Sequence, residues 1–120
     1  MKYMLLVHSA LSDFETRDTD PADMQETFDF MMKLNTELQE SGELLDAAGL
    51  SDPRQAVTVR NQGGAAVPTD GPYAESKEVL GGYWVLDVAS KERALEIAQR
   101  VVGFDGPGCP DAIEVREAMS

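Results

Sequence analysis

Two segments of the sequence carry bulky apolar residues at both odd and even positions, and this feature constrains the fold most. The residues are Tyr3, Met4, Leu5, Leu6 and Val7 in the first segment and Tyr83, Trp84, Val85, Leu86 and Val88 in the second. Successive side chains of a β-strand point to opposite faces of the sheet, so such strands need apolar cover on both faces. The pattern predicts two central strands at residues 2–8 and 82–88.

Two other segments have the apolar periodicity of amphipathic helices. The first follows Asp20-Pro21, a typical N-cap and first-turn pair, and ends before Gly42. Its apolar stripe, which we interpret as core-filling, consists of Met24, Phe28, Phe30, Met31, Met32, Leu34 and Leu38. The second helix follows a Ser90 cap and has apolar residues over 94–102.

The remaining segments complete one domain. Residues 43–50 and 112–119 predict strands, and residues 56–69 predict a hairpin that turns at Asn61-Gln62-Gly63-Gly64. The order is strand, helix, strand, hairpin, strand, helix, strand. This is a ferredoxin-like βαββαβ plan of the α+β class with an inserted hairpin. A chain of 120 residues is typical of one domain, which we place at residues 1–120.

Two helices can cover only one face of this sheet. The bare face would expose Tyr83 or Trp84 with its apolar neighbours, a larger patch than monomers usually tolerate. A second copy of the chain is the commonest cover for such a face. We therefore predict a homodimer that packs sheet against sheet.

The charge of the chain excludes several kinds of partner. Ten basic and 22 acidic residues give a net charge of −12, which repels nucleic acids and anionic membrane surfaces. No apolar run approaches the roughly 20 residues that span a bilayer. The lone Cys109 cannot form an internal disulfide, as expected in a reducing compartment. We predict a cytoplasmic protein that binds neither nucleic acid nor membrane.

Residues 70–78 (DGPYAESKE), with the Leu-Gly-Gly-Tyr that follows at 80–83, resemble a known motif. The chain is similar to the YCII-related family, in particular to the branch named for its Asp-Gly-Pro-Phe (DGPF) motif. The resemblance extends from the first strand to the last and implies a dimeric α+β barrel. Tyr73 replaces the phenylalanine of the motif. Some relatives are proposed to use a histidine on the first helix, and residues 21–41 contain none.

The motif and the single histidine supply the candidate site residues. We take His8 and Asp70 as candidate catalytic residues and Tyr73, Glu75, Lys77 and Trp84 as candidate ligand-binding residues. Histidine is the residue type whose side chain changes charge near neutral pH, His8 is the single histidine, and Asp70 would orient it as a general base. The alternatives are a hydrogen-bonded histidine at a strand end and a purely structural Asp-Gly-Pro turn. One histidine and one cysteine do not make a metal site, and no cofactor motif is present.

Three classes of function remain open. The first is a protein that binds an unknown small molecule, including an accessory protein, since relatives of the DGPF branch are associated with sigma-factor signalling. The second is a cofactor-independent acid–base enzyme acting on a small metabolite. The third is a protein whose acidic face docks a basic partner. An apolar pocket without titratable groups would favour binding, and His8 beside Asp70 in a cleft would favour catalysis.

Overall fold

The computed structural model describes residues 1–10, 21–72 and 78–119. Along the chain lie β1 (Lys2–Ala10), η1 (Pro21–Met24), α2 (Gln25–Glu40), β2 (Leu44–Gly49), η2 (Pro53–Gln55), β3 (Val57–Gln62), β4 (Ala65–Asp70), β5 (Glu78–Asp87), α3 (Lys91–Val102) and β6 (Ile113–Glu117). The predicted alternation of strands and helices is confirmed, and the fold is of the mixed α+β class. No helix among the described residues is long and apolar enough to cross a membrane.

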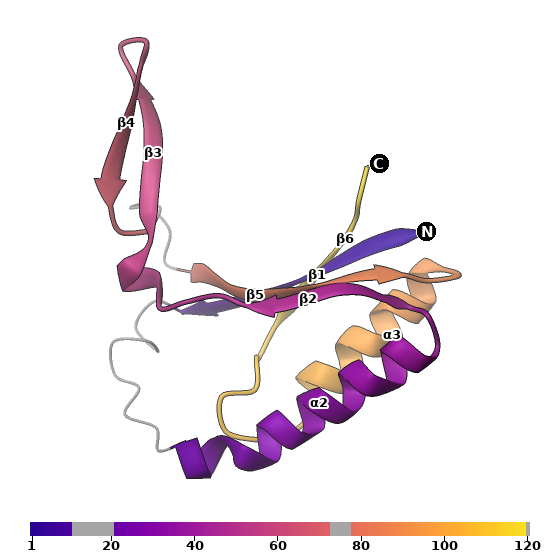
Figure 1. Ribbon diagram of the computed structural model, residues 1–120. Helices are drawn as coiled ribbons and strands as arrows, with labels where there is room; N and C mark the ends of the chain where they lie inside the picture. The colour runs from indigo at the N-terminus through magenta and orange to yellow at the C-terminus, as the bar shows by residue number, and fades with distance from the viewer. Residues whose placement is uncertain (11–20, 73–77, 120) are drawn as a thin grey trace.

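The elements form a sheet with two helices on one side. The sheet has the order β2-β5-β1-β6, and each neighbouring pair is antiparallel. Both α2 and α3 lie against the same face (Figure 1). Strands β3 and β4 form a separate two-stranded sheet that stands away from the helices, on the other side of the main sheet (Figure 1). Its turn contains Gly63 and Gly64, both with positive φ, as hairpin turns of this kind require.

The core lies between the helices and the inner face of the sheet. Its fully buried side chains are Leu5, Leu34, Leu38, Leu86, Ile97 and Val101. The outer face carries Met4, Leu6, Tyr83 and Val85, which are half-buried. Trp84 lies on the inner face and is only 7% exposed, so of the two predicted aromatics only Tyr83 lies on the bare face.

Several sequence-based boundaries need correction. The first helix begins as a 3-10 turn, and its α-helical part starts at Gln25, not at Pro21. Strand β5 begins at Glu78, four residues earlier than predicted, because Glu78 to Leu80 pair with the end of β1 beyond a β-bulge. Gly42 ends α2 with a φ of 80°, as predicted. The stripe of α2 is not all core, since Met32 is 68% exposed.

Candidate functional site

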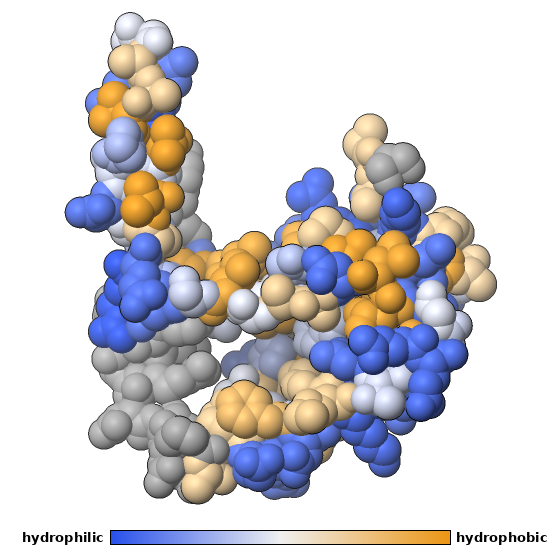
Figure 2. Space-filling model, in the orientation of Figure 1, coloured by the Kyte–Doolittle hydropathy of each residue, from blue (hydrophilic) through white to orange (hydrophobic). Residues whose placement is uncertain are grey.

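A cavity of about 430 Å³ lies between α2 and the inner face of the sheet. We call it the α2 cavity. Its described lining residues are Val7, Met24, Thr27, Phe28, Met31, Asn35, Ala47, Ala48, Gly49, Gly81, Gly82, Tyr83, Trp84, Gly108 and Pro110. Figure 2 shows the molecule hollowed at this place, between the helical layer and the strands above it. The N-terminal half of α2 therefore stands off the sheet, whereas its C-terminal half packs against it through Leu34 and Leu38.

Glycines shape the sheet wall of the α2 cavity. Gly82 pairs with Gly49 of β2, and a Cβ on Gly82 would lie 2.9 Å from the carbonyl oxygen of Ala48. Real Cβ atoms are essentially never found closer than 3.0 Å to another heavy atom, so this approach of the two strands requires glycine. The same residues leave the wall without side chains. Strand packing thus explains Gly82 of the Leu-Gly-Gly-Tyr segment.

Asn35 and Trp84 connect the helix to the sheet across the α2 cavity. The indole Nε1–H of Trp84 donates a hydrogen bond to Oδ1 of Asn35 at 2.8 Å. Asn35 comes one helical turn after Met31, so the same face of α2 presents an apolar side chain and then an amide. The predicted ligand-binding residue Trp84 therefore does line the cavity.

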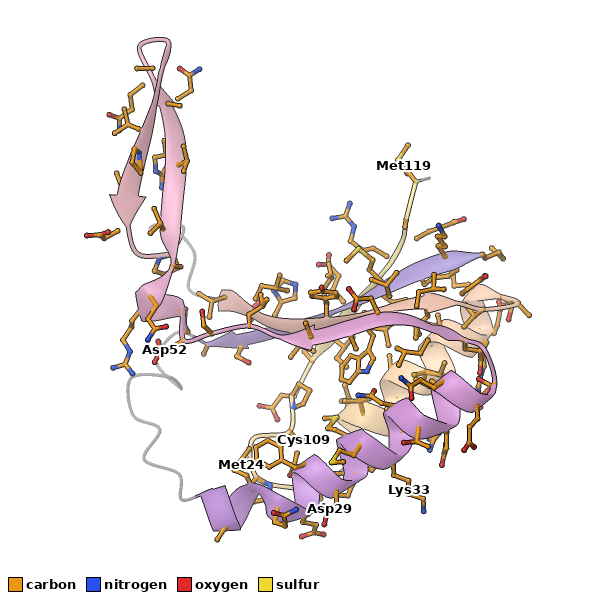
Figure 3. All side chains as sticks on the ribbon, in the orientation of Figure 1. Met24, Asp29, Lys33, Asp52, Cys109 and Met119 are labelled. Carbon is orange, nitrogen blue, oxygen red and sulfur yellow. The ribbon has the colours of Figure 1, made fainter. Side chains whose placement is uncertain are left out.

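The loop between α3 and β6 forms the third wall. Thr27 of α2 is 3% exposed, and its hydroxyl donates to the carbonyl oxygen of Pro107 at 2.8 Å. Phe30 and Phe104 stack with ring centroids 4.2 Å apart. Met24 and Cys109 lie at this end of the molecule (Figure 3). These contacts fix the loop against the start of α2.

Cys109 is not poised to act as a nucleophile. Its Sγ lies 3.0 Å from the carbonyl oxygen of Val101, to which the thiol donates a hydrogen bond. Burial, together with the negative charge of Asp111, raises the pKa of the Cys109 thiol above its ordinary value. A raised pKa lowers the fraction of reactive thiolate. The structure agrees with the interpretation of Cys109 as a loop cysteine.

The described lining of the α2 cavity contains no Asp, Glu, Lys, Arg or His. Tyr83 also borders the cavity, but its side chain lies on the outer face of the sheet, where its hydroxyl donates a hydrogen bond to Oδ2 of Asp46 at 3.1 Å. This bond and the negative charge of Asp46 raise the pKa of Tyr83. A tyrosine in this state stays protonated at neutral pH and is a poor base. Among the described residues, no group of three or more His, Cys, Asp or Glu is placed to hold a metal ion.

The two candidate catalytic residues lie outside the α2 cavity. His8 is on the outer face of the sheet, where its Nε2 lies 3.1 Å from Oε1 of Glu114. Asp70 ends β4 of the separate hairpin and is exposed. Within the described part of the chain, no hydrogen bond or ion pair joins His8 to Asp70. The proposed orientation of His8 by Asp70 is therefore not seen here, and Glu114 occupies that position.

The start of the DGPF-like motif is held by local contacts. Gly71 has a φ of 102°, its N–H donates to the carbonyl oxygen of Ala56 at 2.7 Å, and its own carbonyl accepts from Thr58 Oγ1 at 2.8 Å. These bonds support a structural role for Gly71 in the turn. Tyr73, Glu75 and Lys77 lie outside the described residues.

Most residues of the α2 cavity are not among the candidate site residues predicted from the sequence. Met24, Phe28 and Met31, which the stripe predicts as core residues, line the cavity; Met31 also packs against the core, and Phe28 is 49% exposed. The available signal was the width of the apolar stripe on α2, which exceeds what one face packed on a sheet requires. Asn35 is a polar residue within that stripe.

Comparison with known proteins supports the sequence resemblance. The family model of the YCII-related domain matches residues 1–117. An uncharacterised protein of Rhizobium meliloti is 40% identical over 60 residues, which cover 50% of this chain and 48% of that protein. The matched region thus spans about half the length of this curated relative.

Proposed function

The chain belongs to the YCII-related domain family, and we propose that it is a small-molecule-binding protein whose ligand occupies the α2 cavity. The observation that carries this proposal is an open cavity of about 430 Å³ with an apolar, uncharged described lining. Ligand sites are concave, mostly apolar and supplied with a few polar groups, of which Asn35 and Thr27 are the examples here. Occupation of the cavity would also cover Phe28, which is otherwise half exposed.

A metabolite library tested by thermal shift is the direct experiment, because a ligand that binds only the folded state raises Tm. Each hit is then titrated against the fluorescence of Trp84, the single tryptophan of the chain, which lines the α2 cavity. A hit supports the proposal if it raises Tm and if the Trp84 fluorescence changes with ligand concentration along a single saturable binding curve.

Two neighbouring methionines supply a matched pair of variants for each hit. Met31 lines the α2 cavity, whereas Met32 is exposed and does not. We expect Met31→Gln to weaken binding at least tenfold and Met32→Gln to leave it within twofold. Equal effects of the two variants on every hit, with circular dichroism showing both folded, would place the ligand elsewhere.

We propose further that the protein is a homodimer of ferredoxin-like domains, forming an α+β barrel. The strand order β2-β5-β1-β6 with both helices on one face suits this plan. Met4, Leu6, Tyr83 and Val85 on the outer face would gain cover from a second sheet. Light scattering should give twice the chain mass of 13.1 kDa, and Leu6→Asp should reduce it to one chain. A single-chain mass for the wild type at micromolar concentration contradicts the dimer.

The DGPF-like motif is proposed as a second contributor to ligand binding, through Tyr73, Glu75 and Lys77. A further hollow of about 400 Å³ lies at the base of the hairpin, lined in part by Pro72, Val79 and Leu80, which lie on either side of residues 73–77 in the sequence. Lys77→Met, compared with Lys91→Met on the exposed start of α3, tests the motif's part in binding each hit.

The hydrogen-bonded free thiol of Cys109 is compatible with the cytoplasmic location we propose.

A further inference from the structure

The hydrogen-bonding groups of the α2 cavity show what kind of ligand it would accept. Among the described lining residues whose side chains lie on this side of the sheet, the hydroxyl of Thr27 and the indole N–H of Trp84 each donate to an acceptor of the protein. The amide of Asn35 is the remaining polar side chain among these described lining residues. The ligand chemistry therefore depends on how that amide is oriented.

The orientation of the Asn35 amide follows from its partner. An indole N–H can only donate a hydrogen bond, so the atom of Asn35 that faces Trp84 Nε1 is the oxygen. The amide nitrogen Nδ2 then points away from the indole. Within the described part of the chain, no group accepts a hydrogen bond from Nδ2. Asn35 lines the α2 cavity, so its two N–H donors are available to a bound molecule.

The charge of the lining limits the ligand further. The described lining side chains include no charged group that could pair with a charged ligand. Transfer of such a ligand from water into the cavity is therefore strongly unfavourable. The net charge of −12 adds long-range repulsion of anions. A hydrogen-bond donor on the ligand would gain nothing from Nδ2, which donates only.

We propose that the α2 cavity binds a neutral, mainly apolar molecule whose carbonyl or similar oxygen accepts a hydrogen bond from Nδ2 of Asn35. This inference rests on the proposed function and specifies its ligand class. Asn35 is the specificity-determining residue, because it is held in place by Trp84 and carries the available donor. The aromatic and thioether side chains of Phe28, Met24 and Met31 contact the apolar remainder of the molecule.

Three small probes of nearly the same shape test the ligand class. Acetophenone carries the neutral acceptor, α-methylstyrene replaces its oxygen by a methylene group, and benzoate carries a charge. Binding is followed by the NMR signal of the single indole N–H, which belongs to Trp84 and adjoins Asn35. We expect both neutral probes to shift this signal with saturation and benzoate to bind at least tenfold more weakly than acetophenone.

Asn35→Asp isolates the hydrogen bond, because it keeps an acceptor for Trp84 and removes the Nδ2 donors. We expect it to weaken acetophenone about five- to tenfold more than α-methylstyrene, the value of one net hydrogen bond. Gln39→Glu makes the same chemical change at an exposed position of α2 and should leave all three affinities within twofold.

The outcomes separate this inference from the proposed function. If Asn35→Asp weakens acetophenone and α-methylstyrene equally, or if benzoate binds the wild type best, the role of Asn35 and the ligand class are wrong while binding in the cavity stands. If no probe shifts the indole signal and no metabolite raises Tm, the proposed function is wrong as well.

Discussion

Replacing Gly82 by alanine should weaken the pairing of β2 with β5 beside the α2 cavity. The new Cβ would lie 2.9 Å from the carbonyl oxygen of Ala48 and 3.4 Å from Cα of Gly49. Both atoms belong to the backbone, so the strands must move apart. Such overpacking costs about 1–3 kcal/mol, and the loss of glycine's freedom in the unfolded chain returns about 0.4–1 kcal/mol. We expect a net destabilisation of about 1–2 kcal/mol.

Thermal unfolding at fixed protein concentration measures this effect. For a chain of this length, 1 kcal/mol corresponds to about 4 °C in Tm, so Gly82→Ala should lower Tm by about 4–8 °C. The hydrogen bond from Leu50 N–H to the Gly81 carbonyl, at 2.9 Å, should loosen too, and the Leu50 amide should exchange faster with solvent.

Gly49, which pairs with Gly82, supplies the matched control. A Cβ on Gly49 would meet no atom within 4 Å, and its φ is not positive. Gly49→Ala should therefore leave Tm unchanged or raise it by a few degrees. If the two alanine variants have the same Tm, the close approach of the strands is not what requires glycine at position 82.

Three further predictions concern the pH dependence of stability, the cavity wall and the histidine. The guanidinium of Arg93 donates two hydrogen bonds of 2.9 Å to Glu43 and lowers the pKa of that carboxyl. The Arg93–Glu43 pair stabilises the folded protein fully above the ordinary glutamate pKa of about 4.3. This stabilisation is lost as the pH falls through the lower pKa that Glu43 has in the folded protein. Glu43→Gln should thus lower the free energy of unfolding by about 1–2 kcal/mol at pH 7. The urea midpoint of the variant should also fall less between pH 6 and pH 3 than that of the wild type. Equal pH profiles of the two proteins would contradict this. Thr27→Val should cost about 1–2 kcal/mol in urea unfolding, because it leaves the Pro107 carbonyl without its donor, and an unchanged midpoint would show that the bond is dispensable. His8→Ala should leave binding in the α2 cavity within twofold by fluorescence titration, since His8 lies on the outer face, and a larger loss would restore it as a site residue.

Local patterns in the sequence were sufficient to predict the elements and their order. The alternation in residues 56–69 and the glycines at 63 and 64 define a hairpin whatever surrounds it, and Ser90 does cap α3 by accepting from Arg93 N–H at 3.2 Å. These features act over a few residues through backbone conformation and nearest hydrogen bonds. Local signals failed where pairing with a distant strand decides a boundary, as at Glu78 in β5.

The face on which each apolar residue lies, and hence the cavity, was decided by the tertiary structure. Because successive side chains of β5 point to opposite faces of the sheet, Tyr83 and Trp84 must lie on different faces. This alternation does not determine which of the two faces the helices. Similarly, the stripe on α2 shows that Leu34 and Met31 share a face, yet Leu34 is fully buried in the core, whereas Met31 is partly buried and also lines the cavity. The angle at which a helix crosses a sheet depends on side chains far apart in the chain. Figure 1 shows α2 diverging from the sheet toward its N-terminal end, where the α2 cavity lies.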